Sequence, residues 1–510
     1  MSEHYRTSAQ ASWTHRRKVA TGLAVGLFSV SAVGAAAISA QAGSDSGATQ
    51  VETVSSLSRA AGQDGSSGKA KTVDRGGMVF VQSNDPEQNS ILAFRRAADG
   101  SLTPAGEFPT GGRGGSQQDN PFDPLASQDS LVFDRAHQMM IAVNAGSNSI
   151  TTFRVRGGQL TDRQTVSSGG DFPSSIAVSG KTVYVLNAGG ETNVTGFRMT
   201  KRGLSPLGHS TREIGVTNDA VPLFTDSPPQ VGFSPDGKHL LVTTKSANTI
   251  EVFAVGRGGR LAAEAVSNES VGAVPFSFVF DQGGHLLMTE AGKSGVTSYA
   301  LEDDGALDVI TPSVQSGQQV LCWIARAGEF IYGTNPGSST ISLYTVDAQG
   351  QVTIKGENGV IANAGGDAAV AEVAAAAAAA DSDAPATDAP ATEPPATDAP
   401  ATEPPATEAP ATEAPATEPP ATEAPVTEAP ATEAPATEAP EAPATEAPGA
   451  GPIDLAATAD GGLLYVQNTL AGTIEGFRVG ADGSLELVTT LDEGLPVFAD
   501  GSGMEGLVVW

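Results

Sequence analysis

The sequence predicts an all-β fold, a seven-bladed β-propeller with four-stranded blades, and three observations support this prediction. The first is a recurring β-hairpin, seen at residues 142–155 as AVNAGSNSITTFRV, in which two apolar runs flank a small polar turn and the second run carries an aromatic residue. The second is a glycine that follows the aromatic residue by about six positions in most copies and starts a tight turn into a further strand. The third is the regular spacing of the copies along the chain.

The hairpin occurs seven times, and its aromatic residue marks each copy. These residues are Phe94, Phe153, Phe197, Phe253, Tyr299, Tyr344 and Phe477. The first six are 44 to 59 residues apart, and the last gap of 133 residues includes a segment of 84 residues, 367–450, that does not resemble the repeat. Without that segment the last gap is 49 residues. A period of this length, repeated seven times, is typical of propeller blades.

Each repeat has room for four strands. Upstream of most hairpins lies another apolar run with an Asp/Gly turn, as in SPPQVGFSPDGKHLLVTT. The first copy begins at Gly77 without such an inner strand, whereas a spare strand, Met504 to Trp510, follows the last copy. We expect the C-terminal strand to complete the first blade, because a closed ring leaves no sheet edge open to aggregation.

Residues 1–42 have the features of an export signal. Arg16, Arg17 and Lys18 precede an apolar run rich in Ala, Gly and Ser, and Ala40-Gln41-Ala42 fits a small-x-small cleavage site. The arginine pair and the mildly apolar core resemble a twin-arginine signal; the alternatives are a general secretory signal or a retained membrane anchor. Cleavage leaves no membrane span, and the protein is then secreted, periplasmic or at the cell surface.

The remaining segments divide as a Ser/Gly/Ala-rich disordered leader at 43–75, blades 1–6 at 76–366, a disordered Ala/Thr/Glu/Pro insertion at 367–450, and blade 7 with the closing strand at 451–510. The insertion is either a solvated spacer or a Thr/Pro-rich stalk for glycosylation.

The negative charge of the chain is concentrated in the insertion. Asp381 to Ala450 contains fifteen carboxylates and no Lys or Arg, so this segment supplies half of the formal net charge of −30. So acidic a chain would repel nucleic acid.

Blade topology sorts the candidate residues onto two faces. We call the face with the loops that lead into the innermost strands, and with the turns between second and third strands, the loop face; the opposite side is the turn face. His137, His239 and His285 fall at turns between first and second strands on separate blades, and His209 lies near an outer strand. Because they do not converge, the sequence predicts neither a histidine metal site nor a histidine base, and it indicates no cofactor.

Candidate functional residues cluster on the loop face, which we predict to be the ligand face. The starts of the innermost strands are polar and include Gln128, Asp129, Gln230 and Asp454, so that they could surround a small polyol, sugar or ion, or only water. The ends of the second strands carry Asn144, Asn187, Asn335 and Asn468, and this pattern is broken by Lys245 and Glu290. A repeated Asn at a strand end is most often a turn cap, so the breaks in the pattern are the better functional candidates.

Cys322, the single cysteine, is interpreted as a buried thiol.

These repeats resemble the seven-bladed lactonase family, which includes 6-phosphogluconolactonase-like and carboxymuconate-cyclase-like proteins, and in particular its exported bacterial members. The resemblance rests on SQDSLVF with AVNAGSNSITTFRV, on VYVLNAGG with GFR, on QVGFSPDGKHLLVTTKSANTIEVFAV and on IDLAATADGGLLYVQN. It implies His, Arg and Glu side chains near the central channel, whereas the inner-strand starts here carry Gln128, Asp129 and Ser175.

The sequence therefore leaves the function open between classes. Our leading hypothesis is an exported, monomeric binding module for a small molecule, glycan or cell-wall component, with Gln128, Asn144, Asn187, Lys245, Asn335 and Asn468 as ligand-binding residues. The alternative is a lactone hydrolase or cyclase with Glu290, Asp129 or Asp454 as the catalytic base, and with Lys245 and Arg326 as oxyanion partners. A third possibility is a structural head without a ligand, since propellers host many functions.

Overall fold

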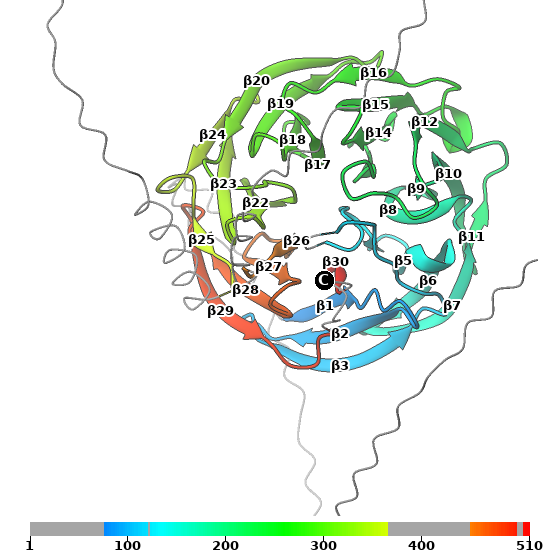
Figure 1. Cartoon of the computed structure of the whole chain (residues 1–510). Helices are drawn as coiled ribbons and strands as arrows, with labels where there is room; N and C mark the ends of the chain where they lie inside the picture. Colours follow the sequence, from blue (N-terminus) through cyan, green and yellow to red (C-terminus); the bar gives the residue numbers. More distant parts are fainter. Residues whose placement is uncertain (1–75, 121–122, 366–448, 497–502) are drawn as a thin grey trace, which may run out of the picture. The chain divides into compact units, whose positions relative to one another are not determined.

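The computed structural model describes residues 76–120, 123–365, 449–496 and 503–510. They form seven antiparallel sheets arranged around a central channel (Figure 1). The predicted seven-bladed propeller with four-stranded blades is confirmed. The predicted export signal, the leader and nearly all of the insertion lie outside the described residues.

The strands of each blade follow the chain from the channel outwards, except in the first blade. From blade 1 to blade 7, the innermost strands are β30 (Glu505–Val509), β4 (Leu131–Asp134), β8 (Asp171–Ser179), β13 (Val231–Phe233), β17 (Pro275–Phe280), β21 (Ile324–Ala327) and β26 (Pro452–Ala457). The second strands are β1 (Gly77–Gln82), β5 (Met139–Asn144), β9 (Thr182–Gly189), β14 (His239–Thr244), β18 (Leu286–Glu290), β22 (Phe330–Asn335) and β27 (Leu463–Asn468).

The outer half of each blade is built in the same order. The third strands are β2 (Ser90–Arg96), β6 (Ser149–Arg156), β10 (Glu191–Thr200), β15 (Thr249–Ala254), β19 (Gly295–Leu301), β23 (Thr340–Val346) and β28 (Thr473–Val479). The outermost strands are β3 (Leu102–Pro109), β7 (Gln159–Ser167), β11 (Gly203–Pro206), β16 (Val266–Glu269), β20 (Leu307–Gln315), β24 (Val352–Lys355) and β29 (Leu485–Leu491). Two short strands, β12 (Arg212–Thr217) and β25 (Ala362–Asn363), pair with β10 and β23.

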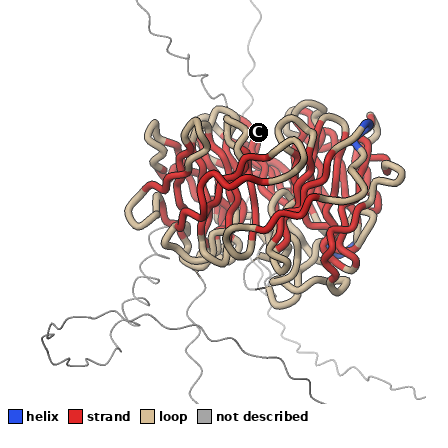
Figure 2. Tube along the Cα trace, turned by 90° about the horizontal axis from the view of Figure 1, so that it is seen from above, coloured by secondary structure: helices blue, strands red, loops and turns tan. Residues whose placement is uncertain are grey.

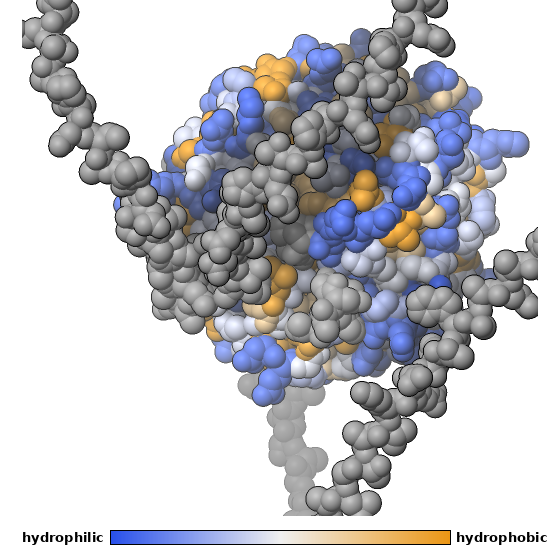
Figure 3. Space-filling view, viewed as in Figure 1, coloured by the Kyte–Doolittle hydropathy of each residue, from blue (hydrophilic) through white to orange (hydrophobic). Residues whose placement is uncertain are grey.

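Figure 2 shows the strands running between two faces that consist mainly of loops and turns. The only helices in the described part of the chain are two 3-10 turns, η1 (Ala145–Ser147) and η2 (Arg257–Gly259). No helix among the described residues is long and apolar enough to cross a membrane. On the face seen in Figure 3 the described surface is largely hydrophilic, with apolar side chains in small separate groups.

The hydrophobic core lies between neighbouring blades rather than in one central cluster. Seven clusters of buried apolar side chains are present, one at each blade interface. The second strands supply much of this core, because both of their faces are covered by adjacent blades, and all six residues of β5 are buried. Burial on both faces explains why these strands are nearly continuous apolar runs in the sequence.

The structure of the blade interfaces explains why the repeat has a glycine at this position. Gly100 has a φ of 101° and Gly483 a φ of 86°, a region in which other residues are strained. The carbonyl oxygens of both accept hydrogen bonds from the preceding blade, from the Tyr465 hydroxyl at 2.7 Å and from the Tyr332 hydroxyl at 2.7 Å. A Cβ atom on Gly483 would come within 2.8 Å of Leu343, so both conformation and contact require glycine there.

The C-terminal strand closes the ring. β30 pairs with β1 in antiparallel register, with Val79 opposite Val509 and Val81 opposite Leu507. The backbone of Trp510 adds a reciprocal pair of 2.8 Å hydrogen bonds with Met78. The predicted completion of the first blade by the C-terminal strand is therefore confirmed.

We expect that a chain ending before Gly503 loses at least about 6 kcal/mol of unfolding free energy, because Met504, Leu507 and Val509 are each at most 5% exposed and each contributes about 2 kcal/mol by burial. Urea unfolding followed by fluorescence measures this loss. The matched control is Leu487→Ala on the outer strand β29, where the side chain is 47% exposed. If the truncated chain were as stable as the full chain, β30 would not be the closing strand.

Candidate functional site in the central channel

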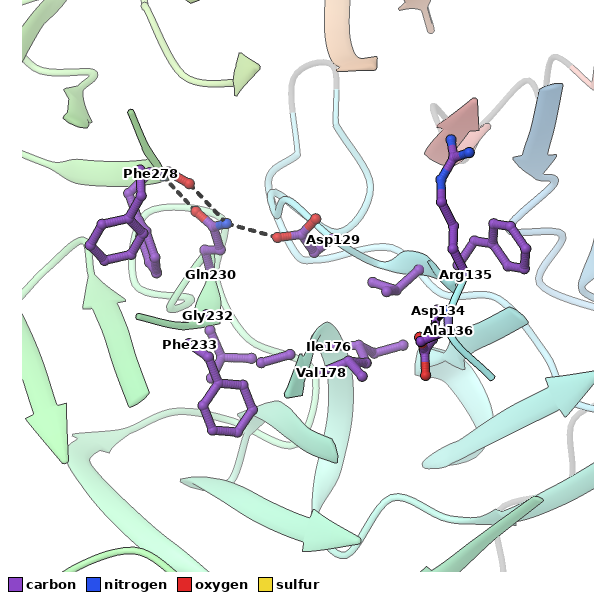
Figure 4. A pocket seen from close by; sticks show the side chains of 15 residues that line it. Asp129, Asp134, Arg135, Ala136, Ile176, Val178, Gln230, Gly232, Phe233 and Phe278 are labelled. Atoms are coloured by element: carbon purple, nitrogen blue, oxygen red, sulfur yellow. Dashed lines mark hydrogen bonds between the residues drawn. The ribbon is translucent and has the colours of Figure 1, made fainter. Parts of the chain in front are cut away.

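The central channel contains a cavity of about 520 Å³, a size suited to a small molecule. The innermost strands β4, β8, β13 and β17 supply most of its wall (Figure 4). Four of its fifteen lining residues are polar or charged, namely Asp129, Asp134, Arg135 and Gln230. The rest of the wall is apolar, apart from the backbone of Gly232.

The cavity opens on the turn face. Along β17, exposure rises from the buried Pro275 to the half-buried Phe280, and β4 and β13 show the same increase from their first to their last residues. The turn after β4 brings Arg135 and Ala136, both exposed, to the rim of the cavity. This cavity therefore opens on the face opposite to the one that the sequence predicts to be the ligand face.

Two loops cover the other end of the channel, and together we call their described residues the cap: 110–120 and 123–130 between β3 and β4, and 218–230 between β12 and β13. They bond to each other through the backbone of Gln118, which donates to Pro222 at 3.0 Å and accepts from Phe224 at 3.0 Å. The first loop also reaches across the ring to blade 6, where the Trp323 Nε1–H donates to the Ser127 carbonyl at 2.9 Å. The side chains beneath the cap are consequently shielded from solvent.

Asp129 is held at the inner end of the cavity by a fixed amide (Figure 4). The backbone N–H of Phe278 donates to Gln230 Oε1 at 2.6 Å, which leaves the Gln230 amide nitrogen to donate to Asp129 Oδ2 at 2.8 Å. Among the described residues no donor contacts the other carboxylate oxygen of Asp129. The backbone of Asp129 has a φ of 65°, a conformation that Asp and Asn tolerate better than most residues.

The surroundings of Asp129 shift its acidity. The protein atoms packed around the carboxyl group remove it from water and raise its pKa from 3.8 to about 6, although the hydrogen bond from Gln230 opposes the shift. The pKa is thus close to neutrality. At pH 7 most molecules carry an ionised Asp129, which can accept a proton from a bound water.

Further carboxyl groups lie under the cap. Burial, followed by the charge of Asp129, raises the pKa of Asp454 to about 8. Burial and the charge of Asp123 raise the pKa of Glu505 well above its usual value, and burial also raises the pKa of Asp123. The backbone N–H of Leu125 donates to Glu505 Oε1 at 2.8 Å and to Asp123 Oδ1 at 3.0 Å. These acids therefore anchor the cap to the closing strand.

Asp454 and Lys245 have comparable anchoring roles. Asp454 accepts backbone hydrogen bonds from Leu455 at 2.9 Å and from Leu507 at 2.8 Å, which ties blade 7 to β30. The Lys245 ammonium group donates to the Phe224 carbonyl in the cap and lies 4.6 Å from the centre of the Phe224 ring. Burial lowers the pKa of Lys245 to about 8. Neither side chain lines the cavity.

Glu290 lies in the interior of blade 5, away from the cavity. Its Oε1 accepts hydrogen bonds from the Thr297 hydroxyl at 2.6 Å and from the backbone N–H of Gly272 at 2.7 Å. The structure thus places Glu290 where it secures the loop that connects blades 4 and 5. The same position in blade 2 is held by Asn144, whose Oδ1 accepts from the Thr110 hydroxyl at 2.6 Å.

The other predicted ligand-binding residues are also engaged within the protein. Asn187, Asn335 and Asn468 are fully buried, and Asn335 donates to the Ser342 hydroxyl at 3.0 Å across its own hairpin. Asn468 donates to Glu475 at 3.1 Å in the same way. Gln128 accepts from the backbone N–H of Ile324 at 3.1 Å and so joins the cap to blade 6. Of the residues predicted as functional, the structure places Asp129 and Gln230 in the cavity wall.

Part of the chain matches a family model of known proteins with this architecture. Residues 210–322 match the family model described as lactonase, 7-bladed beta-propeller. The resemblance to the seven-bladed lactonase propellers is confirmed. No curated protein matches the chain significantly.

Solved structures show the same lactonase-type propeller. A candidate 6-phosphogluconolactonase from Bacteroides uniformis has a TM-score of 0.52 at 16% identity, with 82% of this chain and 96% of that chain covered. A second one, from Bacteroides fragilis, has a TM-score of 0.52 at 15% identity, with coverage of 86% and 98%. The periplasmic gluconolactonase of Pseudomonas aeruginosa has a TM-score of 0.50 at 16% identity, with coverage of 83% and 98%. At these identities the likeness shows the fold.

The central channel has an arginine at its rim that we did not predict as functional. Arg135 lies at the rim and donates to the carbonyl of Val509 at 2.7 Å, and burial lowers its pKa. Next to it, Asp134 Oδ2 lies 2.5 Å from His137 Nδ1. These residues lie at the end of β4 and in the turn after it, and only the assignment of the open face to the turns could have singled them out. No group of three or more His, Cys, Asp or Glu among the described residues is arranged to hold a metal ion.

The raised pKa of Asp129 predicts a pH-dependent stability. Its protonated form is favoured in the folded state, so this stabilising contribution is present below pH 3.8 and is lost as the pH rises through about 6. Asp129→Asn retains an acceptor for Gln230 but carries no charge. We expect the variant to gain up to about 3 kcal/mol relative to the natural chain between pH 4 and pH 8, as measured by urea unfolding.

The control for this experiment is Asp162→Asn, which makes the same change at an exposed residue with a φ of 54°. Its stability difference from the natural chain should vary little with pH. A difference for Asp129→Asn that is equally constant would mean that the carboxyl group titrates normally in the folded protein.

Proposed function

We propose that the protein hydrolyses a small lactone in the central channel, with Asp129 as the general base. The observation that carries the proposal is the position of this carboxylate, which lies at the inner end of a cavity in a lactonase-type propeller and has a pKa raised to about 6. A general base is most effective when its pKa is close to the working pH. Asp129 meets this condition near neutrality.

The reaction requires only water and the lactone. Water attacks the ring carbonyl carbon while Asp129 accepts one of its protons, and a tetrahedral oxyanion forms. When this intermediate collapses, the bond between the carbonyl carbon and the ring oxygen breaks, and the protonated Asp129 returns the proton to the leaving alkoxide. The product is an open-chain hydroxy acid. Gln230 orients the base through its hydrogen bond to Asp129 Oδ2.

A second candidate function is binding without turnover at the same cavity, which belongs to the same class as our leading hypothesis from the sequence but uses other residues and the opposite face. It is favoured by the composition of the wall, because Asp129 has no histidine or glutamate beside it among the described lining residues. The two candidates differ in one measurable property, the consumption of a lactone.

We expect hydrolysis of δ-valerolactone or dihydrocoumarin by the purified chain, with kcat/KM rising with pH through an apparent pKa near 6. Asp129→Asn should lower kcat/KM by about 100-fold or more, while Asp162→Asn should not. Gln230→Met removes the donor that opposes the pKa shift and should move the profile to higher pH. If no lactone is consumed, binding without turnover is the better account.

Export remains part of the proposal. It rests on residues 1–42, and it is supported by the periplasmic location that is stated for the Pseudomonas aeruginosa neighbour. We expect replacement of Arg16 and Arg17 by Lys to leave the protein in the cytoplasm if a twin-arginine route is used, as shown by cell fractionation. Unchanged export would favour the general secretory route, whereas cytoplasmic location of the natural chain would refute export.

A further inference from the structure

The wall of the cavity presents aromatic rings. Phe133, Phe233 and Phe280 are half-buried lining residues, so part of each is exposed, whereas Phe278 is buried against Gly232. A Cβ atom on Gly232 would come within 2.7 Å of the Phe278 ring, so the glycine makes room for this aromatic surface.

Edge contacts hold these rings in place. The ring centres of Phe278 and Phe280 are 6.2 Å apart in a T-shaped arrangement, and Phe133 packs in the same manner against Trp510 at 5.6 Å. A preformed apolar wall favours a ligand that buries a hydrocarbon or aromatic surface against it.

Gln230, the one neutral polar side chain among the described residues of the wall, has little capacity left for the hydroxyl groups of a sugar. Gln230 already uses its oxygen for the backbone of Phe278, and its nitrogen for Asp129 and the Phe278 carbonyl. A polyhydroxylated ligand would transfer several hydroxyl groups from water to a surface with few partners, and each unsatisfied group carries a cost. This argues against a sugar lactone.

The charges of the wall argue against a phosphorylated ligand as well. Asp129 and Asp134 are two carboxyl groups in the lining, and Arg135 is its one cation among the described residues. A phosphate dianion would therefore meet two acidic groups for each basic one, and repulsion between like charges is stronger in a partly enclosed site than in water. Recognition of phosphate usually uses several donors in addition to an arginine.

We infer that the cavity takes an apolar lactone with an aromatic or alkyl body, and that it disfavours a phosphorylated sugar lactone. This inference rests on the proposed function for the turnover of such a lactone. The preference in binding does not, because it follows from the aromatic wall and its charges.

Two measurements on the full chain separate these parts. We expect kcat/KM for dihydrocoumarin to exceed that for 6-phosphoglucono-δ-lactone on the order of 50-fold. Calorimetry then compares binding of the stable products, 3-(2-hydroxyphenyl)propanoate and 6-phosphogluconate, which needs no turnover. Tighter binding of the aromatic product, with no lactone consumed, would refute the hydrolase and support the inference. Tighter binding of the phosphorylated product, or binding of neither, would overturn the inference.

A rim variant tests the charge argument. Ala136→Arg adds a second cation beside Arg135 at an exposed turn position, so we expect it to improve binding of 6-phosphogluconate about tenfold. The matched control is Ala98→Arg, which adds the same charge at an exposed turn of blade 1 away from the cavity and should have no such effect. Equal effects of the two variants would show that net charge, rather than the cavity wall, determines the discrimination.

Discussion

The antiparallel pairing of β30 with β1 is the constraint on which the rest of the structure depends. It converts six complete sheets and one incomplete sheet into a closed ring, so that the channel has a defined width. It also brings Glu505 beneath the cap and places the backbone of Leu507 where Asp454 can accept its hydrogen bond. The position of the cap, and with it the inner end of the cavity, thus depends on the pairing of β30 with β1.

The carboxyl groups under the cap stabilise its backbone by hydrogen bonds, but burial makes their ionised forms unfavourable. Asp123, Asp454 and Glu505 accept backbone hydrogen bonds that would otherwise be lost in a covered region. Their raised pKa values show that they are poorly solvated as anions, and Lys245 offsets the charge of Asp123 only in part. Such a concentration of acids is unfavourable for folding at high pH. The charge of Asp129 contributes to the raised pKa of Asp454, so the acid in the cavity wall is linked to those under the cap.

Much of the fold could be predicted from the sequence because a propeller is a repeat. The spacing of the aromatic residues gives the number of blades, and the surplus strand at the C-terminus indicates the closure. The site was less predictable. The cap has no periodicity, and its bond from Trp323 to Ser127 joins residues 196 positions apart, so nothing in the local sequence indicates which end of the channel is covered. Asp129 was identified because it stands at an inner-strand start, whereas Arg135 was missed because it stands at the opposite end of β4.

Glu290 illustrates the limit of reading a break in a repeat as a functional signal. Its carboxylate accepts hydrogen bonds from Gly272 and Thr297, as amide and hydroxyl groups do at the corresponding positions of other blades. In blade 7 the carboxylate appears instead on the facing strand, as Glu475, which bonds to Asn468. The repeat preserves a hydrogen-bonding pair rather than a residue type, so the change from Asn to Glu needs no catalytic explanation.

The cap across one end of the channel has a kinetic consequence. Beneath the cap, the cavity opens between the turns that follow the innermost strands in the described part of the chain. A molecule formed at Asp129 must leave by the route through which the next one arrives, and the two cannot occupy the cavity together. If the proposed hydrolysis takes place there, the ring-opened acid competes directly with its own precursor, and accumulated product slows the reaction without any separate regulatory site.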